Sequence, residues 1–166
     1  MNVLAEQNKQ YQRHYLYPGA IFVHSRPHLV TTVLGSCVSV CLWDSKARIG
    51  GINHYLLPFW NGEGLPTPKY GNIAIVKLIE KMLASPGCHK NNLIAKVFGG
   101  ASMWEKGSGL LAIGERNCEL AKELLQKHAI PIQACDLGGK VGLKLVFNTL
   151  DGTVLVRRQR GQLGPE

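Results

Sequence analysis

Short runs of apolar and β-branched residues, separated by Gly, Pro and polar turns, follow one another through the first third of the chain. Runs of this length between turn-forming residues are typical of β-strands. The run 37–43, "CVSVCLW", is apolar on both faces, so it should lie in the interior of a sheet. Strands are predicted over residues 20–25, 28–34, 37–43 and 48–58.

Two later segments, residues 72–85 and 117–129, have apolar residues at helical spacing. Asn72 and Asn117 stand at the predicted helix starts, where an Asn side chain can accept a hydrogen bond from a free backbone N–H. Further strands are predicted over 92–101, 130–137, 142–149 and 153–159, and the turn "LDG" should join the last two as a hairpin. Loop or irregular structure is predicted over 59–71 and 102–116.

The eight or nine predicted strands mostly follow one another instead of alternating with the two helices. This order predicts an α/β (α+β) fold in which helices flank a sandwich of largely antiparallel β-sheets. The 166 residues, of which 45% are hydrophobic, suit a single domain over 1–166. Residues 1–15 are expected to form a loose arm and residues 159–166 a basic tail.

Composition narrows the cellular setting. No apolar run reaches the about 20 residues that a membrane-spanning helix needs, and the polar N-terminus lacks an apolar signal core. The five cysteines are an odd number without a C-x-x-C pair, which argues against a disulfide framework and a structural zinc site. We therefore expect a cytoplasmic protein without membrane insertion.

The formal net charge of +8 predicts attraction to an acidic partner, such as nucleic acid, anionic lipid or an acidic protein surface. Basic and aromatic residues do not alternate as a stacking platform for nucleic-acid single strands would need. The segments "GGAS" and "DLGG" contain neither G-x-G-x-x-G nor G-K-[ST], so nucleotide binding is not expected.

The predicted hairpin of strands 37–43 and 48–58 brings a thiol and an imidazole together. A four-residue loop over 44–47 pairs Trp43 with Arg48, and in that register Cys37 faces His54. Facing Cβ atoms lie about 4.5–5.5 Å apart. A slip of one residue would put the two side chains on opposite faces, and Gly50-Gly51 indicates either a bulge or a close approach of the backbone.

A Cys–His pair of this kind supports nucleophilic chemistry at an acyl carbon. An imidazolium beside the thiol is expected to lower its pKa, and the thiolate is the attacking species. Small residues at Gly35-Ser36 would leave backbone N–H groups free to stabilise an oxyanion. The alternative is that Cys37 is a small buried hydrophobe and His54 a hydrogen-bonded core residue.

Other cysteine arrangements are weaker candidates. Cys37 and Cys41 would be about 13 Å apart along a strand, too far to share a metal or a disulfide. Cys88-His89 could be a surface metal-ligand pair, but the sequence offers no partners. Cys118 is interpreted as helix packing, and Cys135 is expected to be buried in an apolar strand.

The motifs "TTVLGSCVSVCLWD" and "GGINHYLLP" resemble those of the chemoreceptor glutamine deamidases, the CheD family of bacterial chemotaxis. The resemblance continues in "PKYGNIAI", "KVFGGASMW", "IGERN", "DLGG" and "GTVLVRR", in the family's order. It implies a sandwich of β-sheets and helices, shared with toxin deamidases. It also implies hydrolysis of selected receptor glutamine amides to glutamate and ammonia, with no metal or cofactor.

The resemblance assigns the nucleophile to Cys37, the histidine to His54 and a supporting threonine to Thr31. From the residues alone Thr32 would serve equally well. One departure is Gly142-Leu143, where the family usually has Gly-Arg. It puts in doubt a strand-end or partner contact.

Partners also follow from the resemblance: methyl-accepting chemotaxis receptors as substrate, and a CheC-type phosphatase. The surface around Cys37, with Met103-Trp104 and the loop 59–71, would be the phosphatase interface. Two other functions compete with the enzyme: a non-catalytic adaptor that regulates such a phosphatase or a receptor, and a basic nucleic-acid-binding protein.

Overall fold

The computed structural model describes residues 11–102 and 111–159. In these residues nine strands form two β-sheets, and two α-helices and one short 3-10 helix accompany them. In chain order the elements are β1 Gln12–Tyr15, β2 Ile21–Val23, β3 His28–Leu34, β4 Val38–Asp44, β5 Ile49–Asn53, α2 Gly71–Leu83, η1 Lys90–Asn92, β6 Leu93–Gly99, α3 Leu111–Lys127, β7 Ile132–Leu137, β8 Leu143–Asn148 and β9 Val154–Arg158.

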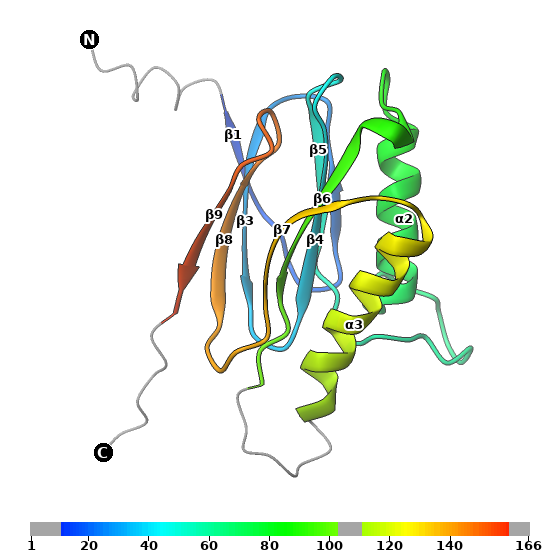
Figure 1. The fold of residues 1–166 in the computed structure, drawn as a ribbon, viewed down its shortest axis with the longest axis vertical. Helices are drawn as coiled ribbons and strands as arrows, with labels where there is room; N and C mark the ends of the chain where they lie inside the picture. The colour runs from blue at the N-terminus through cyan, green and yellow to red at the C-terminus, as the bar shows by residue number, and fades with distance from the viewer. Residues whose placement is uncertain (1–10, 103–110, 160–166) are drawn as a thin grey trace.

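The layers are a four-stranded sheet, a five-stranded sheet and a pair of helices (Figure 1). The four-stranded sheet has the order β1-β3-β8-β9, and the five-stranded sheet the order β2-β5-β4-β6-β7. Neighbouring strands are antiparallel, apart from the parallel pairs β1–β3 and β6–β7. Both α-helices pack on the outer face of the five-stranded sheet. The predicted α+β sandwich is therefore confirmed.

The hydrophobic core has two parts. One lies between the five-stranded sheet and the helices and includes Val40, Leu78 and Leu125. The other lies between the two sheets and includes Ile52 and Phe147. Because β4 and β5 contribute to both, they are the buried centre of the molecule, as the apolar pattern of 37–43 predicts.

Gly50 and Gly51 allow both layers to approach β5 closely. A Cβ on Gly50 would lie 2.8 Å from the Phe147 ring between the sheets. A Cβ on Gly51 would lie 2.9 Å from the Met82 sulfur on the helix side. The β4–β5 pairing runs without a register shift from Cys41–Ile52 to Asp44–Ile49. Close approach, rather than a bulge, therefore explains this glycine pair.

The predicted starts of both helices, and their Asn caps, are wrong. Helix α3 begins at Leu111, so residues 111–116 are not irregular and Asn117 lies inside the helix. Helix α2 begins at Gly71 after Tyr70, and Asn72 instead accepts a hydrogen bond from Trp60 N–H. In both cases the Asn side chain bonds a group outside its own helix, which the pattern within the helix does not reveal.

The predicted N-terminal arm is partly ordered. Strand β1 within residues 1–15 pairs in parallel with β3. Gln159 N–H donates to Gly142 O, so the first residue of the predicted tail is still bonded to the sheet. The rest of both segments, residues 1–10 and 160–166, lies outside the described residues. Among the helices of the described part, none is long and apolar enough to cross a membrane.

Candidate active site

Residues 35–37 carry the chain from the four-stranded sheet to the five-stranded sheet, at the end of the sandwich where β3 stops and β4 starts. Three consecutive carbonyls of this crossing are fixed by hydrogen bonds. Ala101 N–H donates to Gly35 O at 2.9 Å and Gly100 N–H to Cys37 O at 2.9 Å. Asn117 Nδ2 donates to Ser36 O at 3.0 Å. The crossing therefore has little freedom to move its half-buried Cys37 side chain.

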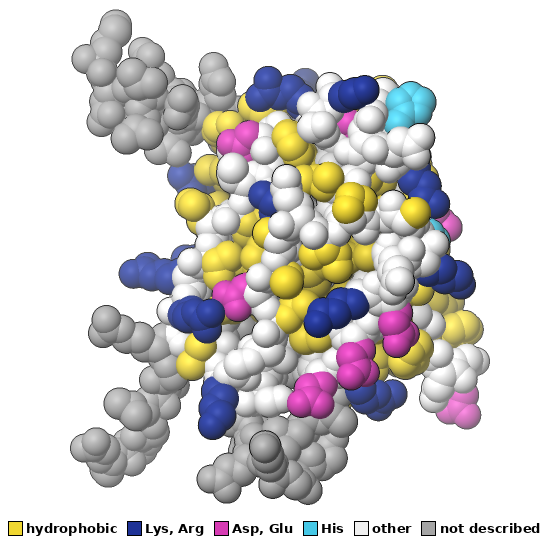
Figure 2. All heavy atoms as spheres, in the orientation of Figure 1, with side chains coloured by type: hydrophobic (Ala, Val, Ile, Leu, Met, Phe, Trp, Pro, Cys, Tyr) yellow, Lys and Arg dark blue, Asp and Glu magenta, His cyan; other side chains and the backbone are white. Residues whose placement is uncertain are grey.

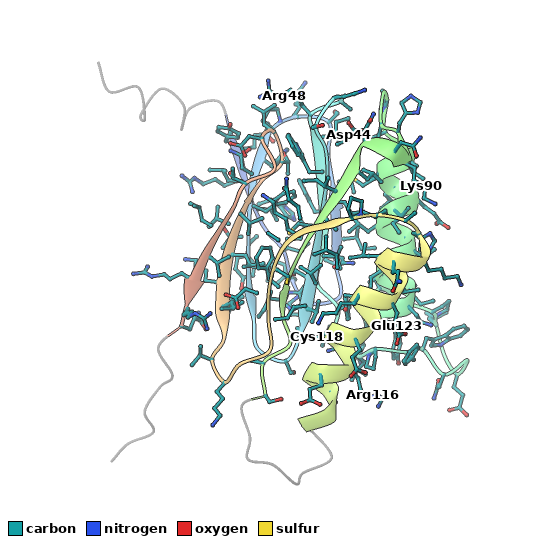
Figure 3. The ribbon with its side chains drawn as sticks, in the orientation of Figure 1. Asp44, Arg48, Lys90, Arg116, Cys118 and Glu123 are labelled. Carbon is teal, nitrogen blue, oxygen red and sulfur yellow. The ribbon has the colours of Figure 1, made fainter. Side chains whose placement is uncertain are left out.

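Two glycines at the end of β6 make this close packing possible. Gly99 and Gly100 have φ of 110° and 69°, values that favour glycine. A Cβ on Gly99 would collide with Cys37 O, and one on Gly100 with the Cys118 sulfur. Cys118 lies on the side of α3 that faces the five-stranded sheet (Figure 3). The "FGGA" motif thus lets β6 and α3 approach the cysteine-bearing crossing.

The β4–β5 register differs from the predicted one. Asp44 pairs with Ile49, so the turn begins one residue later than predicted, and Trp43 does not pair with Arg48. The Asp44 carboxylate explains the difference, because it accepts hydrogen bonds from Lys46 N–H and Ala47 N–H at 2.9 Å each. A sequence-local Asx turn therefore closes the hairpin. Asp44 and Arg48 mark this turn at the end of β4 away from Cys118 (Figure 3).

The change shifts the pairing by two residues, so the face of each side chain is unchanged. Val38 and Tyr55 form the last bridge, with reciprocal backbone hydrogen bonds of 3.1 and 3.0 Å. Cys37 and His54 each precede one member of this bridge, so they are diagonal neighbours on one face instead of directly opposite. Diagonal neighbours lie about 7–8 Å apart, with Cβ atoms closer, within reach of an aromatic ring.

That shared face is the space between the two sheets. Cys37 packs against the inter-sheet cluster, and His54, with 2% of its surface exposed, reaches the opposite sheet. There, Thr32 Oγ1 lies 2.7 Å from His54 Nδ1. Backbone bonds to neighbouring residues also hold His54, because its N–H donates to Ala20 O and its carbonyl accepts from Gly19 N–H.

The hydrogen bonds around Thr32 determine which ring nitrogen of His54 carries the proton. The Thr32 hydroxyl has one proton and donates it to Leu16 O at 2.8 Å. It must therefore accept from His54, which places the imidazole proton on Nδ1. The other nitrogen, Nε2, then has a free lone pair, and it is buried without a hydrogen-bond partner among the described residues. This nitrogen is available as a base.

Burial also sets the protonation state of both groups. It lowers the pKa of His54 to about 4. It raises the pKa of the Cys37 thiol, and the backbone N–H of Cys37 itself offsets part of that rise. Burial therefore favours the neutral form of both groups over the expected imidazolium–thiolate pair. The sequence analysis did not include this desolvation of both groups when it expected an imidazolium.

Thr31 lies on the other side of the sheet. Its neighbours in β3 alternate in burial, with Val30 and Thr32 facing the inter-sheet space and Thr31 facing outward. There Thr31 lines a hollow together with Arg13 and Lys144. The expected contact with His54 is thus made by Thr32. Both threonines are two residues from apolar neighbours in β3, so strand alternation alone does not favour either of them.

The structure also places the remaining predicted residues. Leu143 is buried in the inter-sheet cluster, opposite Leu34 on β3 and Arg158 on β9. Arg158 forms an ion pair of 3.2 Å with Asp136, which joins the edges of the two sheets. Met103 and Trp104, predicted to lie in a partner surface, fall outside the described residues.

The other cysteines have different surroundings. Cys41 is buried between the sheets, and Cys118 is buried where α3 packs on β6. Cys88 is buried beside Asp44, and burial together with this carboxyl raises its pKa to about 12. Cys135 is exposed, contrary to prediction, because β7 is an edge strand. Among the cysteines of the described part, Cys37 is the one that is half-buried.

Asn117 ties the cysteine-bearing crossing to the segment after His54. Its side-chain Nδ2 donates to Ser36 O and to Leu56 O, both at 3.0 Å. The backbone carbonyl of Asn117 accepts a hydrogen bond from the Tyr55 hydroxyl. The first bond holds the backbone next to Cys37, and the second holds the backbone two residues after His54. Asn117 is therefore the structural link between the two halves of the site.

Replacing Asn117 should weaken this link measurably. We expect Asn117→Ala to lower the free energy of unfolding by about 2–3 kcal/mol, because two half-buried carbonyls lose their donors. Asn72→Ala is the matched control, since Asn72 makes a single, half-buried bond to Trp60 N–H, and it should cost about 1 kcal/mol or less. Urea unfolding followed by circular dichroism measures both. Equal losses would contradict the role given to Asn117.

Comparison with known proteins agrees with this architecture. The family model "CheD chemotactic sensory transduction" matches residues 56–158. A protein of Trichlorobacter lovleyi named "Probable chemoreceptor glutamine deamidase CheD" is 51% identical over 151 residues, covering 91% of this chain and 93% of its own length. Proteins of the same name are 48% identical in Sulfurimonas denitrificans, covering 89% of this chain and 95% of the relative, and 39% identical in Methanococcus maripaludis, covering 84% and 90%. The chain belongs to the CheD family.

Proposed function

We propose that this protein hydrolyses glutamine side-chain amides on chemoreceptors, giving glutamate and ammonia, with Cys37 as nucleophile and His54 as base. The names of its relatives support the reaction and the substrate. The observation that carries the assignment to residues is the buried, unpartnered Nε2 of His54, on the same face of the sheet as the half-buried Cys37.

The chemistry starts from two neutral groups. As Cys37 Sγ attacks the carboxamide carbon, His54 Nε2 takes the thiol proton. The tetrahedral intermediate collapses when His54 returns that proton to the nitrogen, which leaves as ammonia and forms a thioester. Water then attacks the thioester, again losing a proton to His54, and the thiol departs with that proton. The products are glutamate and the free enzyme.

Thr32 supports this cycle through the other ring nitrogen. It accepts a hydrogen bond from Nδ1–H, so the ring keeps Nε2 free for the thiol. When His54 becomes an imidazolium in the middle of each step, the same bond is charge-assisted and therefore stronger. Thr32 is a positioning residue, because it acts on the substrate only through His54.

The positions of Gly35 and Ser36 support their predicted role in stabilising the oxyanion. The carbonyl and N–H of a trans peptide point in opposite directions. Because Ala101 holds Gly35 O and Asn117 holds Ser36 O, the N–H groups of Ser36 and Cys37 are directed away from those partners. Two fixed donors beside the nucleophile are the arrangement that stabilises a negative oxygen in the transition state.

A CheC-type phosphatase as second partner remains a prediction from the resemblance, and a cytoplasmic location remains a prediction from the composition. Labelling of Cys37 with an alkylating agent at pH 6 does not distinguish an enzyme from a non-catalytic adaptor. Burial raises the pKa of this thiol, so slow labelling is expected for either function. Release of ammonia does separate them.

Cys37→Ala tests the proposed nucleophile. We expect it to reduce ammonia release from a purified receptor cytoplasmic fragment to background, because alanine has no thiol to form the thioester. Cys135→Ala is the control, since this cysteine is exposed on the edge strand and should keep wild-type activity. Activity of Cys37→Ala above a tenth of wild type, with mass spectrometry confirming conversion of glutamine, would remove Cys37 from the reaction.

The adjacent threonines offer a matched pair of variants. Thr32→Val should lower kcat by about 10- to 100-fold, because the ring loses the acceptor that fixes its tautomer. Thr31→Val should leave kcat within about twofold of wild type, because Thr31 faces the outer surface. Circular dichroism and thermal unfolding verify that both variants fold. The opposite order of effects would return the supporting role to Thr31.

A further inference from the structure

The outer face of the four-stranded sheet carries unbalanced positive charge. Its outward-facing positions in β1, β3, β8 and β9 include Arg13, Lys144 and Arg157, all exposed, and no acidic residue. Lys144 lies directly across from Arg157 in the β8–β9 pair. Arg13, Lys144 and Arg157 line two adjoining hollows, which share Lys144 and Gln159. We call this surface the basic sheet face.

The helix side of the molecule has a different charge pattern. Helices α2 and α3 together carry five Lys and Arg and four Glu, so their charges nearly cancel. Figure 2 shows Lys and Arg projecting at the left edge, on the side of the four-stranded sheet, whereas acidic side chains gather over α3. An acidic partner would therefore be drawn to the sheet side.

The basic sheet face also carries exposed apolar surface. Tyr15 and Leu155 are 47% and 70% exposed, and Leu155 pairs with outward-facing Val146. Apolar groups between cations favour a protein surface over nucleic acid, whose contacts are mainly to phosphates. In the described part of the chain both α-helices lie on the other side of the sandwich, so neither covers this face.

This face ends beside the proposed nucleophile. Val33 and Lys144 form an outward-facing pair near the end of β3, and Cys37 follows Val33 by four residues. Four residues of extended chain span about 13 Å. A glutamine presented at Cys37 would therefore place the surface that flanks it within reach of this pair.

We propose that the basic sheet face is the docking surface for an acidic protein surface that flanks the target glutamine. The proposal deepens the deamidase function and rests on it. Arg13, Lys144 and Arg157 attract carboxylates on either side of the target, and Tyr15 and Leu155 supply apolar contact. The face selects its substrate by charge and apolar contact, whereas Cys37 and His54 perform the chemistry.

Kinetics with two substrates test this assignment. In the full-length protein, Arg13→Glu, Lys144→Glu and Arg157→Glu are combined. The matched control combines Lys77→Glu, Lys81→Glu and Lys122→Glu, which make the same change in net charge on the exposed helix side. Ammonia release is measured from a purified receptor cytoplasmic fragment and from a short glutamine peptide with neutral flanks, at low and high salt. Thermal unfolding verifies the folding of each variant.

We expect the sheet variant to raise KM for the receptor fragment by about tenfold or more and to lose most of its salt dependence, with kcat within about twofold. The helix-side control should stay within about threefold of wild-type KM. Neither variant should change kcat/KM for the neutral peptide. Equal effects of the two variants on the receptor fragment, or wild-type KM in the sheet variant, would overturn the proposal.

Direct binding separates this proposal from the deamidase function. Fluorescence anisotropy with the labelled receptor fragment should show weaker binding by the sheet variant alone. If the wild-type protein released no ammonia from the receptor, the deamidase function would fail, and the binding comparison would still decide the docking surface. Equally tight wild-type binding to a short DNA duplex or to anionic phosphatidylserine vesicles, with the same loss in the sheet variant, would show that the face recognises anions in general and would refute an acidic protein surface as its occupant.

Discussion

The hydrogen bond between His54 and Thr32 joins the two sheets of the sandwich and fixes the imidazole between them. The Thr32 hydroxyl donates its proton to Leu16 O, so in the bond to His54 the ring is the donor through Nδ1–H. The free lone pair of the ring is therefore on Nε2. The rest of the site serves this arrangement. Gly99-Gly100 and Asn117 hold the cysteine-bearing crossing and the segment after His54 in place, so that both side chains face the same space.

Burial gives this pair a different character from an exposed Cys–His pair. Removing the ring and the thiol from water disfavours their charged forms, so the resting site is neutral and separates charge only when substrate is present. A protonated thiol is a slow nucleophile toward alkylating agents and oxidants. In the proposed mechanism, burial would thus limit side reactions of the cysteine and leave it to react with a bound amide whose leaving group takes the proton from His54.

The sequence predicts the layers, the central strands and the face shared by Cys37 and His54, because strand alternation survives any even shift in register. It could not predict the register itself, which depends on the Asp44 carboxylate closing the turn. It could not separate Thr31 from Thr32, since that choice requires knowing which face of β3 is covered. The role of Asn117 was also hidden, because its two acceptors are more than 60 residues away in the chain.

Nitrogen-15 NMR of the His54 ring across pH 3.5 to 8 tests the central claim most directly. At neutral pH the account predicts a neutral ring with the proton on Nδ1 and a bare Nε2, and a pKa near 4 that changes little in Cys37→Ala. A ring protonated on both nitrogens at pH 7, which becomes neutral when Cys37 is replaced, would instead reveal an imidazolium–thiolate pair. That result would contradict the account.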